Sequence, residues 1–203
     1  MTIFFPGIAG DYESVLDGRA SGGLIINDSL IIDPGIGFLI KSGLKNADQI
    51  LISDKDLLYC NDANAIIKRF NAKIVSETDD IKQIGNSFKI LTNKYFLGYI
   101  HNPKLTKAFA EEFKDMNILV IRTESTSIED MINLIEYVNP ELAILTGFRH
   151  NIDPLLFSRH VKDELKKYKE HLKTQIIAAK DGMKINPDSY NIKIRQKSLK
   201  GFI

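Results

Sequence analysis

The chain has 203 residues, a formal net charge of +1 and a single cysteine. This length favours one domain over residues 1–203, and the small charge excludes a general electrostatic attraction to nucleic acid or to an anionic membrane. Cys60 alone excludes an internal disulfide and a cysteine cluster for zinc. No apolar run approaches the roughly 20 residues of a membrane-spanning helix, and the first residues lack a basic signal-peptide region. We therefore expect a cytoplasmic protein.

Apolar runs separated by turn residues predict a strand-rich first half. The runs 24–26 and 30–32 flank Asn27-Asp28-Ser29, a composition typical of a turn. Apolar residues three and four positions apart predict a helix over 63–70. The strands predicted in this half cover residues 1–6, 24–26, 30–32, 50–53, 88–91 and 95–100.

Strand and helix alternate in the second half. Ser127 is a candidate N-cap for a helix over 127–137, and Pro154 stands at the favoured first position of a helix that reaches about Leu172. The other elements predicted here are a helix over 105–113 and strands over 118–121, 142–145, 176–179 and 191–194. Early strands followed by alternation predict an α/β (α+β) protein with two sheets covered by helices on their outer faces. This is a four-layer αββα sandwich.

Three stretches resemble known parts of one fold. The runs Gly22-Gly23-Leu24-Ile25-Ile26 and Leu30-Ile31-Ile32-Asp33-Pro34-Gly35 resemble the opening hairpin of the metallo-β-lactamase fold. Ala179-Lys180-Asp181-Gly182-Met183 resembles its closing strand, and Cys60-Asn61-Asp62-Ala63-Asn64 resembles the end of the metal loop in a small prokaryotic group of metallo-hydrolase-like proteins. The resemblance covers nearly the whole chain and implies the αββα sandwich.

The metal-ligand motif of that family is degenerate here. The family has Ser-His-x-His-x-Asp-His after an apolar strand, whereas this chain has Ser53-Asp54-Lys55-Asp56-Leu57-Leu58-Tyr59. The resemblance also places the bridging aspartate and the final histidine after later strands. The six vestigial ligand positions that it implies are Asp54, Asp56, Leu58, Tyr59, Asn102 and Gly147.

These residue types do not suit a dinuclear zinc site. Such a site needs imidazole nitrogens and carboxylates that converge at about 2 Å around a bridging hydroxide. Leu58 cannot ligate a metal and Gly147 has no side chain. We therefore expect neither the zinc of the family nor another cofactor, and we predict no catalytic residue.

Two alternative sites remain open. Asp54 and Asp56, with Asp62, offer carboxylates to a hard cation, although we prefer to interpret them as capping or solvated loop carboxylates. A rebuilt metal site would use Asp54, Asp56, His101 and His150. Alternatively, an open pocket walled by Tyr59, Arg149 and His150 would be polar and slightly basic, and would suit an anion or a nucleotide.

Three functions follow in order of preference. The first is a non-catalytic binding or assembly protein, whose partner is a second copy of itself or an active relative. The second is a metal-dependent hydrolase with an altered ligand set, acting on a phosphodiester or another ester. The third is a sensor of a small anion or nucleotide that uses the vestigial cleft. The basic residues after Gly182 are expected to form a solvated edge rather than a nucleic-acid surface.

Overall fold

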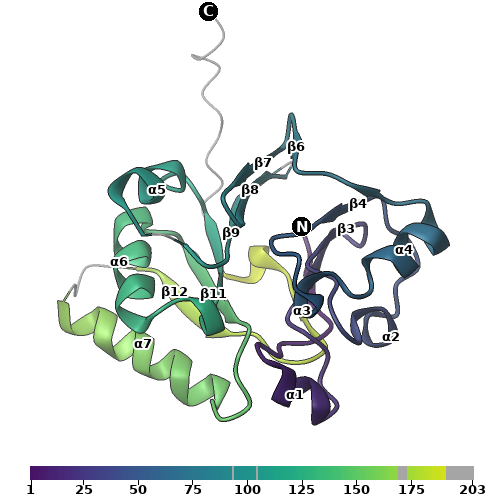
Figure 1. Ribbon diagram of the computed structural model, residues 1–203. Coiled ribbons are helices and arrows are strands. Elements are labelled where there is room, and N and C mark those ends of the chain that lie inside the picture. Colours follow the sequence, from purple (N-terminus) through teal and green to yellow (C-terminus); the bar gives the residue numbers. More distant parts are fainter. Residues whose placement is uncertain (93, 104, 169–172, 191–203) are drawn as a thin grey trace, which may run out of the picture.

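Two β-sheets face each other in the computed structural model, which describes residues 1–92, 94–103, 105–168 and 173–190 (Figure 1). The first sheet has six strands in the order β13-β1-β2-β3-β4-β5, and the second has seven in the order β12-β11-β10-β9-β8-β7-β6. No helix among the described residues is long and apolar enough to cross a membrane.

The first sheet is built from short strands. Its strands are β1 (Ile3–Phe5), β2 (Leu24–Ile26), β3 (Leu30–Ile32), β4 (Gln49–Leu51), β5 (Lys73–Ile74) and β13 (Met183–Ile185). The predicted hairpin is confirmed, since β2 pairs with β3 with Ile26 opposite Leu30. Asn27 and Asp28, the first two of the three connecting residues, both have positive φ. β13 pairs with β1, so it joins the late part of the chain to its start.

The second sheet contains the more buried strands. Its strands are β6 (Glu77–Thr78), β7 (Ile81–Ile84), β8 (Ser87–Leu91), β9 (Phe96–Ile100), β10 (Ile118–Arg122), β11 (Leu142–Thr146) and β12 (Gln175–Ala178). β9 to β12 run parallel to one another. Every residue of β10 and β11 is buried, because both faces of these parallel strands are covered.

Helices cover the outer faces of both sheets (Figure 1). The α-helices among the described residues are α1 (Tyr12–Leu16), α2 (Phe38–Ser42), α3 (Leu57–Cys60), α4 (Ala63–Phe70), α5 (Lys107–Glu112), α6 (Ile128–Val138) and α7 (Pro154–Tyr168). α2 and α4 share a small apolar cluster with the first sheet, whereas α5, α6 and α7 pack on the second. The main buried cluster includes residues of both sheets, such as Phe5 and Tyr99, together with residues of α5, α6 and α7.

The predicted four-layer architecture is confirmed. The helices predicted at 63–70, 105–113 and 127–137 and the strands of both halves are present, with ends that differ by at most two residues. The strand predicted over 50–53 ends at Leu51, because the Asp33 carboxylate binds the backbone N–H of Ser53. The strand predicted at 191–194 and the last residues of the helix predicted to reach Leu172 lie outside the described residues.

Candidate functional site

Polar residues gather where several strands end, at the edge of the sandwich near α1 and α3. Asp33 follows β3, Ser53 follows β4, His101 follows β9, and Arg122 is the last residue of β10. All four are buried. Together with Tyr59, Tyr99 and Glu124 they form the buried polar cluster. Carboxyl ends of strands are where α/β proteins commonly place functional side chains.

Asp33 is the centre of this cluster. Its Oδ1 accepts the backbone N–H of Ser53 at 2.7 Å, and its Oδ2 accepts the hydroxyls of Ser53 at 2.6 Å and of Tyr99 at 2.5 Å. Burial raises the pKa of the Asp33 carboxyl, against the opposite pull of the Arg122 charge and of these hydrogen bonds. The carboxyl group is thus fully used within the protein and has no exposed surface.

His101 is a neutral partner of this carboxyl through Ser53. Its Nδ1 lies 2.8 Å from Ser53 Oγ. Because Ser53 has one hydroxyl proton and gives it to Asp33, Nδ1 must carry the proton in this bond, and Nε2 carries a lone pair. Burial, and then the Arg122 charge, lower the pKa of His101 to about 4. The ring stacks on Tyr59 with centroids 4.5 Å apart.

A buried ion pair joins Arg122 and Glu124. Arg122 Nε donates to Glu124 Oε1, and Arg122 NH1 donates to the Gly22 carbonyl at 2.6 Å and to Tyr99 at 3.3 Å. The guanidinium lies 4.6 Å from the centroid of the Tyr59 ring, which adds a cation–π contact. Burial alone would lower the pKa of Arg122, but the charge of Glu124 and the tyrosine neighbours hold it well above its ordinary value. Arg122 therefore stays charged.

Two of the predicted vestigial ligand positions contact Glu124. Tyr59 donates its hydroxyl to Glu124 Oε1 at 3.2 Å. Gly147 has φ +69°, and a Cβ atom there would collide with Glu124 Oε2. The structure therefore brings Tyr59 and Gly147 together on either side of one carboxylate that the sequence analysis did not single out.

The carboxylates of the loop before α3 make local hydrogen bonds. Asp56 caps α3 by accepting the Leu58 N–H at 2.8 Å, and it also accepts the Tyr12 hydroxyl at 2.7 Å. Asp54 accepts the Asp56 N–H at 3.0 Å. Asp62 accepts the backbone N–H of Leu39 at 2.8 Å, which ties α2 to the start of α4. These contacts agree with the capping interpretation of the three carboxylates.

Leu58 and Asn102 occupy different surroundings. Leu58 is buried and its carbonyl lies against Gly35. Asn102 follows β9 with φ +44°, and its backbone N–H donates to Ser125 Oγ at 3.0 Å. Leu58 has no ligating atom in its side chain.

An open hollow of about 420 Å³, the entrance hollow, lies beside the buried polar cluster. It contains the predicted pocket residues Arg149 and His150 and the vestigial Leu58. Its lining residues are Gly10, Asp11, Tyr12, Glu13, Leu58, Glu124, Arg149, His150 and Asn151. Glu124 lines it and pairs with Arg122, so it joins the hollow to the buried cluster.

Three side chains in the entrance hollow form a compact group. His150 Nδ1 lies 2.5 Å from Glu13 Oε2 and 3.6 Å from Asp11 Oδ2. Hydrogen bonds from Ser14 and His150 lower the pKa of Asp11 to about 2, although its partial burial acts in the opposite direction. Among the described residues this is the one group of three or more His, Cys, Asp or Glu side chains with ligand atoms within 4.8 Å of one another. The rebuilt set of Asp54, Asp56, His101 and His150 is not brought together in this way.

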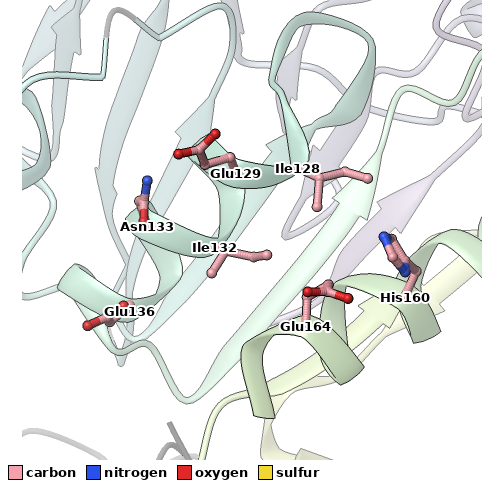
Figure 2. Close-up of a pocket in the computed structure, with 7 residues that line it drawn as sticks. All are labelled: Ile128, Glu129, Ile132, Asn133, Glu136, His160 and Glu164. Carbon is pink, nitrogen blue, oxygen red and sulfur yellow. The ribbon is translucent and has the colours of Figure 1, made fainter. Parts of the chain in front are cut away.

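A second hollow, of about 700 Å³, lies between α6 and α7 (Figure 2). It shares no lining residue with the entrance hollow. Its walls combine apolar and acidic side chains, with one histidine. They are Ile128, Glu129, Ile132, Asn133, Glu136, His160 and Glu164. It belongs to the helical layer and not to the strand ends where the buried polar cluster lies (Figure 2).

Sequence reasoning missed Asp11, Glu13, Arg122 and Glu124. One signal for the last two was present, because Arg122-Thr123-Glu124 follows directly on the apolar run 118–121. A charged pair at the end of a central strand lies where site residues are common. Asp11 and Glu13 give no comparable signal, since only the fold brings them to His150.

Solved structures share this fold at low sequence identity. The metallo-β-lactamase fold protein YhfI from Bacillus subtilis matches with TM-score 0.68 and 12% identity, over 91% of this chain and 98% of that one. Igni18, a metallo hydrolase from Ignicoccus hospitalis, matches with TM-score 0.66 and 10% identity, over 91% and 98% of the two chains. A diphosphatase of the PhnP family matches with TM-score 0.57 and 12% identity, over 91% and 97%.

Sequence comparison adds no relative to these structures. No protein-family model and no curated protein sequence matches the chain. The fold therefore rests on the two facing sheets, their helical layers and the three structural matches. On that basis the chain has the metallo-β-lactamase fold.

Proposed function

We propose that this protein is a non-catalytic member of the metallo-β-lactamase fold, retained as a binding or assembly protein. In this proposal the buried polar cluster has replaced the dinuclear zinc site. The partner would be a second copy of the chain or an active relative. The structural neighbours described as a metallo hydrolase and a diphosphatase support the alternative, a hydrolase.

The buried Arg122 guanidinium is the observation that carries the proposal. It has no exposed surface, and it lies against Tyr59, one of the vestigial ligand positions. Its partner Glu124 fills the space at Gly147, another such position. A fixed, desolvated positive charge among these residues opposes the entry of two zinc ions. Leu58 and Gly147 add no ligand atom, so the residues present do not fit a dinuclear zinc site.

The entrance hollow also bears on the sensor alternative. It presents the carboxylates of Asp11, Glu13 and Glu124 against Arg149 and His150. One Arg149 nitrogen donates to the backbone carbonyl of Glu124 at 3.0 Å, which directs that donor to the protein. Glu124 is paired with Arg122, and the two remaining carboxylates, Asp11 and Glu13, favour a cation over a phosphate or another anion.

Metal content and hydrolysis test the proposal together. We would dialyse the untagged wild-type chain and a Glu13→Gln/His150→Gln double variant against zinc, and measure metal by elemental analysis and turnover of bis(p-nitrophenyl) phosphate. The double variant lacks two members of the compact group in the entrance hollow. Zinc that it still binds would therefore report on the six predicted vestigial ligand positions. We expect less than about 0.1 zinc per chain in that variant, against two for an intact dinuclear site. We expect no turnover in either protein. About two zinc ions per chain in the double variant, or zinc-dependent turnover, would overturn the proposal.

The assembly role has its own measurement. Sedimentation velocity of the full chain, alone and mixed with an active relative, reports self-association and pairing. A species that stays monomeric in both samples contradicts assembly and leaves ligand binding as the role to pursue.

A further inference from the structure

We propose that Asp11, Glu13 and His150 form a binding site for one divalent transition-metal cation at the entrance hollow. This site is separate from the six vestigial ligand positions. It goes beyond the proposed function, because it would exist whether or not the protein is catalytic.

The three ligand atoms already lie near coordination geometry. The closest pair, His150 Nδ1 and Glu13 Oε2, are 2.5 Å apart, and all three atoms lie within 4.8 Å of one another. Metal–ligand bonds of about 2.1 Å put adjacent ligand atoms roughly 3 Å apart. Small rotations of the exposed Glu13 and His150 side chains therefore suffice to surround a cation.

The backbone holds two of these ligands in place. Asp11 is the N-cap of α1, and its Oδ1 accepts the Ser14 N–H at 2.8 Å. Its Oδ2 accepts the backbone N–H of His150 at 3.1 Å, which fixes the loop after β11 against α1. Glu13 is in the first turn of the same helix, so α1 presents both carboxylates to the histidine.

Glu124 lines the same hollow but is paired with the buried Arg122. Its side chain is 6% exposed and lines the entrance hollow. Arg122 Nε and the Tyr59 hydroxyl both bind Oε1, whereas the buried Oε2 has no hydrogen-bond partner among the described residues. An unpaired buried carboxylate oxygen is costly. This oxygen lies against Gly147, and Glu124 is not a member of the compact group, so the proposed site rests on Asp11, Glu13 and His150 alone.

The donor set selects the class of metal. One imidazole with two carboxylates suits manganese, iron or zinc better than calcium, which takes oxygen ligands alone. Three protein ligands leave coordination positions for water or for an anionic group of a ligand. The nearby Arg149 does not occupy the site, since its donor is directed to the Glu124 carbonyl.

Manganese binding followed by electron paramagnetic resonance tests the site directly. The full chain, freed of metal with a chelator, would be titrated with Mn²⁺, which loses its free-ion signal on binding. We expect one Mn²⁺ per chain, and at least tenfold weaker binding in each of the variants Glu13→Gln and His150→Gln. His160→Gln is the matched control, because His160 lies with Glu164 at the other hollow. We expect it to bind as the wild type does.

Two outcomes would overturn the site: no saturable binding below about 1 mM, or unchanged binding in Glu13→Gln and His150→Gln. Thermal unfolding of each variant checks the fold, which these exposed side chains do not hold together. This result is independent of the zinc measurement above. Zinc that the Glu13→Gln/His150→Gln double variant still binds counts against the non-catalytic function. Zinc that the wild type binds and the double variant does not bind supports the entrance site.

Discussion

Arg122 and Glu124 meet inside the protein, where neither charge reaches bulk water. Arg122 has no exposed surface and the Glu124 side chain is 6% exposed. In such surroundings the pair contributes little net stability, because the desolvation of both groups offsets their attraction. Removal of one partner has a much larger effect, since it leaves the other charge buried without compensation.

The first prediction concerns this asymmetry. Arg122→Met leaves Glu124 unpaired and removes the donor to the Gly22 carbonyl. We expect it to lower the free energy of unfolding by about 3–5 kcal/mol. Adding Glu124→Gln removes the orphaned charge and keeps an acceptor for the Tyr59 hydroxyl, so the double variant should recover at least half of the loss. Urea unfolding measures both. A double variant no more stable than Arg122→Met would contradict the ion-pair argument.

The second prediction concerns the pH dependence of stability through His101. Its pKa is lowered to about 4 in the folded protein, against about 6.5 in an unfolded chain. Between these values the unfolded state binds more protons, so stability is complete above pH 6.5 and is lost as pH falls toward 4. The shift corresponds to about 3 kcal/mol at most. The charged groups that act on the ring are Arg122 and Asp54.

A variant isolates this effect. His101→Gln should flatten the stability profile between pH 4 and 6.5, whereas His160→Gln should not. Burial raises the pKa values of Asp33 and Glu124, so these two carboxyl groups make stability fall as pH rises. This contribution is the same in the wild type and in His101→Gln. Urea midpoints at pH 5 and pH 7.5 give the comparison. Equal slopes for wild type and His101→Gln would mean that the histidine is not held neutral.

At the scale of elements, the turn after β11 is built around a glycine. Gly147 and Gly182 both have positive φ, +69° and +72°, but only Gly147 has a neighbour where a Cβ would go. We expect Gly182→Ala to lose about 1 kcal/mol, the penalty of the left-handed backbone alone. Gly147→Ala should lose at least about 2 kcal/mol more, because its methyl group meets the Glu124 carboxylate. Thermal or urea unfolding compares the two. Equal losses would show that Glu124 moves aside freely, and would reopen the position to a ligating side chain.

Elements with strong local signals could be predicted from the sequence. Ser127 does cap α6, and Asn27 and Asp28 do form the hairpin turn. The one-turn helices α1 and α3 were missed, because so few residues carry no periodic signal and depend on the caps of Asp11 and Asp56. The closing strand that the resemblance placed at Ala179–Met183 begins only at Met183, as β13, because the residues before it form a turn. Its pairing with β1 joins segments far apart in the sequence.

The candidate site could be predicted only in part. The resemblance located Tyr59 and Gly147 at one edge of the sandwich, and both lie against Glu124 there. It could not indicate what fills that edge, because burial of Arg122 depends on the packing of both sheets around it.

At the scale of the whole molecule, the two sheets share one apolar core. Residues of β1 to β4 and of β8 to β12 belong to the same buried cluster, while a smaller cluster lies under α2 and α4. Pairing of β1 with β13 closes the first sheet with a strand from the end of the described chain. Because the two sheets contact each other through this shared core, we expect neither sheet to unfold without the other.

The last prediction is that the protein unfolds as one cooperative unit. Leu24 on β2 is fully buried in the shared core, and Leu24→Ala should lower the free energy of unfolding by about 2–5 kcal/mol. Leu16→Ala is the matched control, because Leu16 is 86% exposed and its truncation should change stability by less than about 0.5 kcal/mol. Hydrogen exchange reports the two sheets separately. The slowest amides of β2 and of β10 should lose the same protection in Leu24→Ala. If β10 kept its protection while β2 lost it, the second sheet would be stable alone, and the buried polar cluster at the sheet ends would connect two folding units.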